Sequence, residues 1–213
     1  GVYQVRKSDE LYEQGLFYSD KGLKKKEIAL IRSFAKKKGF VVRKVEEFVK
    51  EIFFPITYDL NGLCICFNLP FDVSRLAVRH ATSRGFARAF TFILIENRYL
   101  PRIRIKHLNR KTSLIQFTIP ARQMDSRSSR KRGKRSLSKR GYFLDVRTLA
   151  SAILSKSYDL KGLSSHLQIE HQKLETDEHG KTLTEKYLLY AINDVHAPWE
   201  CYCKLRDQYN SYG

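Results

Sequence analysis

The stretch "ICFNLPFDVSRLA" (residues 65–77) marks a change from strand to helix within a few residues. The apolar run 62–68 has the length of a strand, and the apolar spacing that follows predicts a helix over residues 71–84. Asn68 and Asp72 stand four residues apart at this junction. An acid in the first turn of a helix is favoured by the helix dipole, and an ionised carboxylate there also suits a hard metal ion. Both interpretations of Asp72 stay open at this point.

Strand and helix patterns alternate on both sides of the junction, which predicts an α/β fold. The last helix is expected to begin at a capping box formed by Thr182 and Glu185 and to carry an apolar stripe on one face. That stripe consists of Leu188, Ile192, Val195 and Trp199. Strands are expected at 2–7, 11–19, 62–68 and 142–146, and helices at 24–39, 45–53, 71–84, 147–154, 159–169 and 182–209.

The charge of the chain points to a polyanionic partner. Forty Lys and Arg residues against 22 Asp and Glu residues give a formal net charge of +18. Such an excess favours nucleic acid as the partner, through release of its counterions. No apolar stretch approaches the roughly 18 residues of a membrane span, and no secretory signal opens the chain. Four cysteines are too few for a disulfide scaffold, so we expect an intracellular protein, cytoplasmic or nucleoid-associated, with its thiols buried as small apolar groups.

Residues 95–141 are expected to form a basic insertion within a single domain that spans residues 1–213. Three strand-like stretches predict an antiparallel hairpin or meander, and in "RIRIK" the alternation places the basic side chains on the face opposite Ile103 and Ile105. The segment 122–140 contains nine Lys or Arg and a single Asp, which predicts a mobile, nucleic-acid-binding loop. The expected basic contacts are Arg102, Arg104, Lys106, Arg130, Lys131, Arg132, Lys134 and Arg135.

Three further polar side chains stand where chemistry is plausible. Tyr190 and Asp194 are four residues apart on the last predicted helix, so they share a face, roughly opposite the apolar stripe. They form either a solvated surface pair or a functional pair. Asp145 begins a helix after a strand, where it either caps the helix or supports a site near the strand end.

Two of these segments resemble motifs of one nuclease superfamily. Residues 68–72, with their Asn, aromatic residue and Asp after an apolar strand, resemble the second motif of the DEDD exonucleases. "YAIND" (190–194) resembles the third motif in its tyrosine form, because Leu189 stands where the histidine form has a His. The chain is most similar to the 3′→5′ exonuclease domain of family B DNA polymerases. The resemblance implies an RNase H-like mixed central sheet flanked by helices, with a basic antiparallel β-hairpin insertion.

The resemblance also implies a chemistry. Two Mg²⁺ or Mn²⁺ ions would assist hydrolysis of the phosphodiester at single-stranded DNA 3′ ends, either as proofreading beside a polymerase partner or as trimming. Asp194 and Asp72 would be metal ligands, and Tyr190 would position the attacking water. From the residues themselves, Asn68 is expected either to orient the site or to satisfy backbone groups at the strand end. Phe71, Tyr190 or aromatic residues near the hairpin are expected to stack on unpaired bases.

The chain departs from the family in one respect, since no Asp-x-Glu, the first motif, occurs in its 213 residues. We expect that the sequence begins just after that motif, which would supply two further carboxylates. The alternatives are a catalytically inactive nucleic-acid-binding module of the same fold and an RNA exonuclease.

Overall fold

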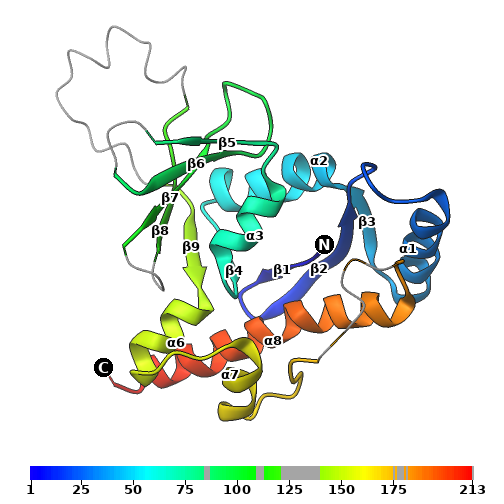
Figure 1. Cartoon of the computed structure of the whole chain (residues 1–213). Helices are drawn as coiled ribbons and strands as arrows, with labels where there is room; N and C mark the ends of the chain where they lie inside the picture. Colours follow the sequence, from blue (N-terminus) through cyan, green and yellow to red (C-terminus); the bar gives the residue numbers. More distant parts are fainter. Residues whose placement is uncertain are drawn as a thin grey trace, which may run out of the picture. The chain divides into compact units, whose positions relative to one another are not determined.

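The computed structural model describes residues 1–83, 87–108, 113–120, 140–174, 176, 180 and 182–212. These residues form an α/β protein with a three-stranded, a two-stranded and a four-stranded sheet (Figure 1). They divide into two compact units: unit 1 comprises 1–48 and 149–213, and unit 2 comprises 49–148. The α/β class is confirmed, while the description of the chain as one domain stays a prediction.

The sheet of unit 1 is mixed, with the strand order β1-β2-β3. β1 (Val2–Lys7) pairs antiparallel with β2 (Glu10–Tyr18), and β2 pairs parallel with β3 (Val41–Lys44). A parallel neighbour requires a crossover, which α1 (Lys25–Lys38) supplies. The two strands predicted at the start of the chain are confirmed.

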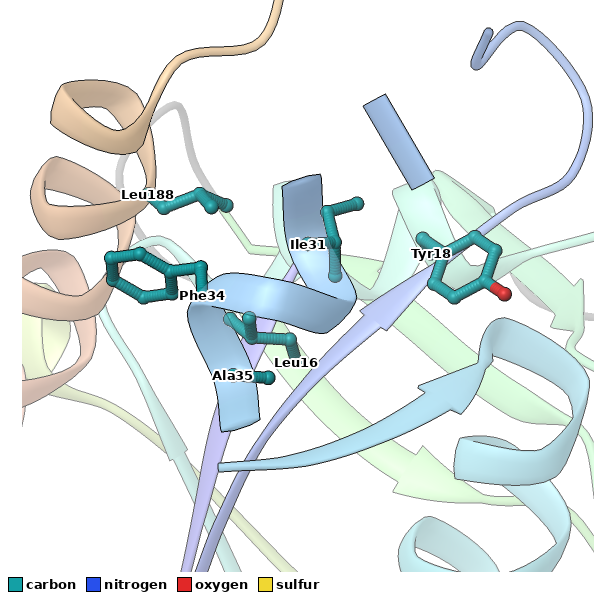
Figure 2. Packing of buried hydrophobic residues seen from close by; sticks show 6 residues of the cluster. All are labelled: Leu16, Tyr18, Ile31, Phe34, Ala35 and Leu188. Carbon is teal, nitrogen blue, oxygen red and sulfur yellow. The ribbon is translucent and has the colours of Figure 1, made fainter. Parts of the chain in front are cut away.

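Packing of α1 on this sheet produces the core of unit 1. The helix ends at Gly39, whose φ of 72° is a left-handed conformation that glycine adopts without strain. At the other end Glu27 accepts hydrogen bonds from the backbone N–H groups of Lys24 at 2.8 Å and Leu183 at 2.9 Å, which ties α1 to the start of the last helix. Figure 2 shows the buried cluster between these elements: Leu16, Tyr18, Ile31, Phe34, Ala35 and Leu188.

The last helix, α8 (Glu185–Asn210), is packed on two faces. Its cap is Thr184, whose hydroxyl accepts from the N–H of Tyr187 at 3.1 Å, so the predicted start at Thr182 is two residues early. Leu188 is buried, but the rest of the expected stripe is only half-buried. At about 100° per residue, the fully buried Ala197, Cys201 and Leu205 lie on nearly the opposite side. None of the described helices has the length and apolar character needed to cross a membrane.

Helix α7 (Leu160–His166) packs against α8 within unit 1. Its first residue follows Asp159, whose carboxylate accepts from the N–H of Gly162 at 2.7 Å. Ser164 is fully buried on this helix and lies within hydrogen-bonding reach of the Cys201 thiol. Cys201 is buried, as expected, whereas Cys64, Cys66 and Cys203 are only half-buried.

Unit 2 begins with helical turns that are wider than those of an α-helix. After α2 (Val45–Glu47) the chain forms two π-helical segments, η1 (Phe48–Phe53) and η2 (Pro55–Asp59). The sequence predicts a helix that ends before Pro55, but Pro55 instead opens the second segment. The residues before Pro55 are already helical, and the helical run continues without a break from Val45 to Asp59.

Two parallel strands of unit 2 each lead directly into a helix. β4 (Leu63–Cys66) pairs with β9 (Tyr142–Asp145). β4 is followed by α3 (Leu69–Leu76), and β9 by α6 (Val146–Leu154). Since the carboxyl ends of parallel strands share an edge, the residues after both strands lie near one another.

The basic insertion is part of a four-stranded antiparallel meander, in the order β5-β6-β7-β8. The meander is confirmed, but it is larger than predicted. The helix predicted over 71–84 ends at Leu76, because Val78 donates its N–H to Ile93 at 2.8 Å and the chain continues as a strand. Long-range pairing thus overrides the local helical pattern. The strands are β5 (Arg79–Thr82), β6 (Ala89–Ile93), β7 (Ile103–His107) and β8 (Ser113–Phe117).

We expect Phe34→Ala to lower the free energy of unfolding of unit 1 by about 3–5 kcal/mol, because it leaves a cavity in the α1 core. Urea unfolding followed by far-UV circular dichroism measures this. Leu189→Ala removes an apolar side chain of the same unit that is 47% exposed, and it should cost less than about 1 kcal/mol. Equal losses in the two variants would contradict the assigned core.

Candidate active site

Tyr190 and Asp194 lie on α8 in unit 1, on the same side as Ala197 and Cys201. The spacing of four residues brings their side chains to one face, as predicted. That face is not the solvated surface that its position opposite the expected stripe suggested. Both side chains are half-buried, because the segment that follows α7 runs across them.

Lys173, in that segment, joins the two side chains. Its Nζ donates to the Tyr190 hydroxyl at 2.5 Å and to Asp194 Oδ2 at 2.5 Å, and it contacts Oδ1 as well. The ammonium also lies 4.1 Å from the centre of the Tyr190 ring. The side chains of Lys173 and Asp194 are only 20% and 29% exposed, so the pair is shielded more than an ordinary surface ion pair.

The sequence interpretation did not identify Lys173. The residue stands in a polar stretch with no helical or strand periodicity, and its partners are 17 and 21 residues away along the chain. A lone lysine in a chain with 40 Lys and Arg residues gives no signal of its own. Only the folded arrangement distinguishes it.

The three groups change one another's proton affinity. Burial by itself would lower the pKa of Lys173, but hydrogen bonds and charges from Asp194 and Tyr190 outweigh it and raise that pKa above its usual value. Burial and the Asp194 carboxylate raise the pKa of Tyr190, and Lys173 partly opposes them. At neutral pH the site therefore contains an ammonium and a neutral phenol.

A second polar group joins Glu200 of α8 to the segment that follows α7. Among the residues that the structure describes, Glu170, His171 and Glu200 bring potential metal-ligand atoms within 4.8 Å of one another. The Glu200 carboxylate is already engaged with His171, through the ring and the backbone N–H. This group contains neither of the two aspartates that the sequence predicts as metal ligands, so their assignment as ligands stays a prediction.

Asp145 in unit 2 connects the ends of β4 and β9. Its Oδ1 accepts from the N–H groups of Arg147 at 2.9 Å and Thr148 at 3.4 Å, in the first turn of α6, which confirms the helix cap. The same oxygen accepts from the N–H of Asn68 at 3.3 Å, across the sheet edge. Burial raises the pKa of Asp145 even though these N–H groups oppose the shift. Asn68 itself is exposed, with a left-handed φ of 64°.

Asp72 lies in the first turn of α3, half-buried, near the same strand ends. Cys66, the last residue of β4, is the register partner of Asp145 on β9. A hydrogen bond from Cys64, burial, and the charges of Cys64, Asp72 and Asp145 together raise the pKa of the Cys66 thiol well above its usual value. Asp145 accepts from the N–H of Asn68, and Asp72 lies in the first turn of the helix that follows, so all three residues lie near the carboxyl ends of β4 and β9.

The predicted alternation on the basic strand is confirmed. Ile103 and Ile105 of β7 are 0% and 1% exposed, and Arg104 and Lys106 point to the other, partly open face. Arg102 is exposed just before β7. Phe71 is also open to solvent, at 51%, with the Arg75 guanidinium 4.8 Å from the centre of its ring. The predicted contacts in the basic loop, Arg130, Lys131, Arg132, Lys134 and Arg135, lie outside the described residues.

We expect Lys173→Met to raise the pKa of Tyr190 further, because the cation that opposes the upward shift is lost. Asp194→Asn should lower the same pKa, since it removes the carboxylate that raises it. An NMR titration of ring-labelled tyrosine, with the signal assigned by Tyr190→Phe, measures both shifts.

Lys186→Met is the matched control, because Lys186 is exposed on the same helix. It should leave the Tyr190 titration unchanged. A downward shift in Lys173→Met would contradict the contact between Lys173 and the phenol.

Comparison with known proteins found no matching family model, no matching curated protein and no matching solved structure. The contacts separate into two groups, each inside one compact unit: Lys173, Tyr190 and Asp194 in unit 1, and Asn68, Asp72 and Asp145 in unit 2.

Proposed function

We propose that these residues belong to a metal-dependent 3′→5′ exonuclease that acts on DNA, of the tyrosine form of the DEDD superfamily and with an RNase H-like fold. The observation that carries the proposal is the joint contact of Tyr190 and Asp194 with the Lys173 ammonium. Their burial against a cation supports a role in chemistry.

The three side chains suit hydrolysis of a phosphodiester. The raised pKa of Tyr190 keeps its phenol neutral, so its hydroxyl can both donate a hydrogen bond to a water molecule and accept one. Lys173 carries a positive charge that can neutralise a phosphate oxygen as negative charge develops on it. Asp194 supplies a carboxylate, the type of ligand that hard divalent cations prefer.

The donor set fits Mg²⁺ or Mn²⁺, although it is incomplete. Asp194 in unit 1 would hold an ion, and metal ions bound at such a site would polarise the scissile phosphate and activate water. The attraction of Asp194 for a cation is visible in its pairing with Lys173. Asp145 engages Oδ1 in hydrogen bonds to three backbone N–H groups, so we assign it to positioning Asn68 and α6. Two more carboxylates, which an Asp-x-Glu would provide, are required for a full site.

The charge of the chain supports a nucleic-acid substrate. Its net charge of +18 favours binding to a phosphate backbone, and the partly open face of β7 contains Arg104 and Lys106. The exposed ring of Phe71 could stack on an unpaired base at a 3′ end. Contacts with phosphates and stacking on bases discriminate little between nucleotide sequences, as an exonuclease requires.

The decisive experiment measures release of 3′ nucleotides from 5′-labelled single-stranded DNA and RNA, with Mg²⁺ or Mn²⁺. It uses the natural protein that contains these residues, so that any Asp-x-Glu outside residues 1–213 is present. We expect metal-dependent stepwise shortening of DNA, reduced more than about a hundredfold by Asp194→Asn, because a two-metal site fails without one of its ligands.

Asp207→Asn, which removes an exposed acid from the same helix, is the control and should keep full activity. Binding of DNA without any shortening would instead identify the inactive binding module. Preference for RNA would identify an RNA exonuclease. Normal activity in Asp194→Asn would refute the assignment of the site.

Substitution on β7 tests the binding face separately. If Lys106 contacts a phosphate, Lys106→Gln should reduce the slope of log affinity against log salt by about 0.7 on single-stranded DNA, because one fewer counterion is released. Fluorescence anisotropy at several salt concentrations measures the slope. Lys38→Gln, at the exposed end of α1, is the charge-matched control. An unchanged slope in Lys106→Gln would remove β7 from the interface.

A further inference from the structure

We infer that Glu200 and His171 are positioning residues, which hold the segment 171–173 on α8 so that Lys173 reaches Tyr190 and Asp194. The inference that these contacts matter for turnover rests on the proposed function. The holding of Lys173 can be tested without it.

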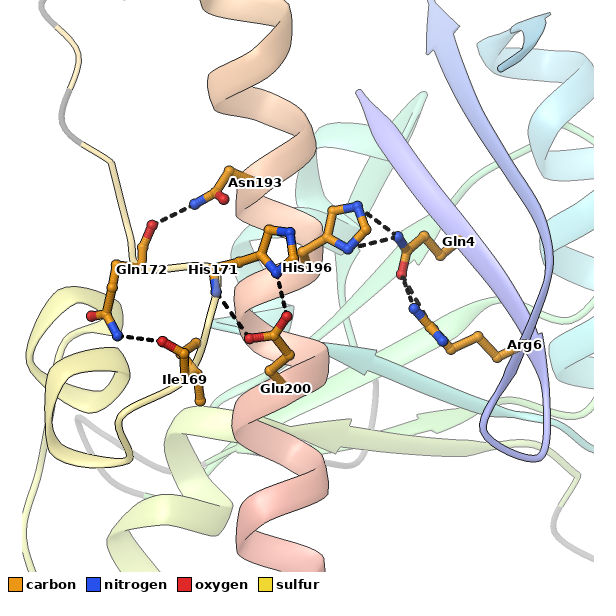
Figure 3. A network of polar contacts seen from close by, with 8 residues as sticks. All are labelled: Gln4, Arg6, Ile169, His171, Gln172, Asn193, His196 and Glu200. Carbon is orange, nitrogen blue, oxygen red and sulfur yellow. Dashed lines mark hydrogen bonds and ion pairs between the residues drawn. The ribbon is translucent and has the colours of Figure 1, made fainter. Parts of the chain in front are cut away.

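The first restraint on this segment is the pair of contacts between His171 and Glu200. The backbone N–H of His171 donates to Glu200 Oε2 at 3.0 Å, and Nδ1 of its ring contacts Oε1 (Figure 3). One carboxylate therefore fixes both the backbone and the side chain of the same residue. The ring of His171 also stacks on His196, with centres 4.6 Å apart and planes 17° from parallel. His196 in turn lies 3.1 Å from the amide nitrogen of Gln4 on β1.

The second restraint is at the next residue, Gln172. Asn193 of α8 donates to the backbone carbonyl of Gln172 at 2.6 Å. The side-chain amide of Gln172 turns the other way and donates to the carbonyls of Ile169 at 2.6 Å and Ser164 at 3.1 Å. Gln172 thus connects α8 to the end of α7 (Figure 3).

Lys173 is the next residue of the segment, and its partners also lie on α8. As the segment advances from His171 to Lys173, its partners on α8 move from Glu200 back to Asp194. Six residues of helix span about 9 Å, and two residues of extended chain span about 7 Å. The segment therefore runs antiparallel to the helix, and the long lysine side chain covers the remaining distance.

A lysine side chain has four rotatable carbon–carbon bonds and loses considerable conformational entropy when its ammonium is confined. Confinement between a phenol and a carboxylate is favourable only if the backbone of Lys173 is already in place. The segment is not part of a helix or strand, so regular backbone pairing does not fix it. Glu200 and His171 supply that restraint from the opposite side of Gln172.

The test compares Glu200→Ala with Glu200→Gln. The side-chain amide that Glu200→Gln introduces can still accept from the His171 N–H and donate to Nδ1, whereas the methyl group left by Glu200→Ala cannot. The first measurement is the rate at which an acylating reagent modifies Lys173, read by mass spectrometry against Lys44. We expect Glu200→Ala to speed acylation of Lys173 about tenfold through local opening, and Glu200→Gln to change it less than about twofold.

The second measurement is the kinetics of 3′-nucleotide release. Glu200→Ala should lower kcat about tenfold and change KM less than about twofold, because substrate binding elsewhere is kept. In a Lys173→Met background the same substitution should cause no further loss of kcat, which a general structural defect would not reproduce. Glu185→Ala, which removes an acid from the first turn of α8, is the control and should change neither readout.

Unchanged acylation of Lys173 in Glu200→Ala would overturn the inference, as would an equal rise for every lysine. A loss of kcat that persists in the Lys173→Met background would overturn it too. If the wild-type protein releases no nucleotide, the proposed function fails, but the acylation rates still decide whether Glu200 holds Lys173.

Discussion

The ion pair between Lys173 and Asp194 is the contact on which the organisation of the site in unit 1 depends. A half-buried carboxylate without a nearby cation would be costly, and so would a half-buried ammonium without an anion. Each therefore requires the other in the folded state. Because Lys173 belongs to a segment without regular secondary structure, the pair joins that segment to α8. The Tyr190 hydroxyl takes part in the same contact and so acquires a fixed position.

The packing of α8 on two faces explains why this contact is shielded. Leu188 faces the core of unit 1, whereas Cys201 faces Ser164 of α7, and Ala197 is fully buried one turn before Cys201. The second face consists largely of small side chains, which contribute little to a hydrophobic pattern, so the sequence indicated only the first. A face that appeared solvated is in fact covered. Burial of a helix by small residues is therefore the feature that periodicity failed to detect.

Local signals predicted most elements, and long-range contacts account for the errors. The helix α1 and the alternation of β7 follow from spacing that one segment carries by itself. The strand at 79–82 does not, since its pairing with β6 decides its conformation. The same division applies to the site: Tyr190 and Asp194 share one helix face and could be predicted together. Lys173 meets them only after the chain has turned back, so no sequence pattern could identify it.

The large positive charge of the chain affects its carboxylates as well as its partners. Asp194 is paired with Lys173, Asp9 with Arg206 and Glu13 with Arg43, so the protein's own cations already neutralise these acids. A divalent ion that binds Asp194 must therefore compete with Lys173 for the same oxygens. A bound phosphate would weaken this competition, because it offers the ammonium another anionic partner. In the proposed function, substrate and metal ions would then favour each other's binding, and Lys173 would couple the two.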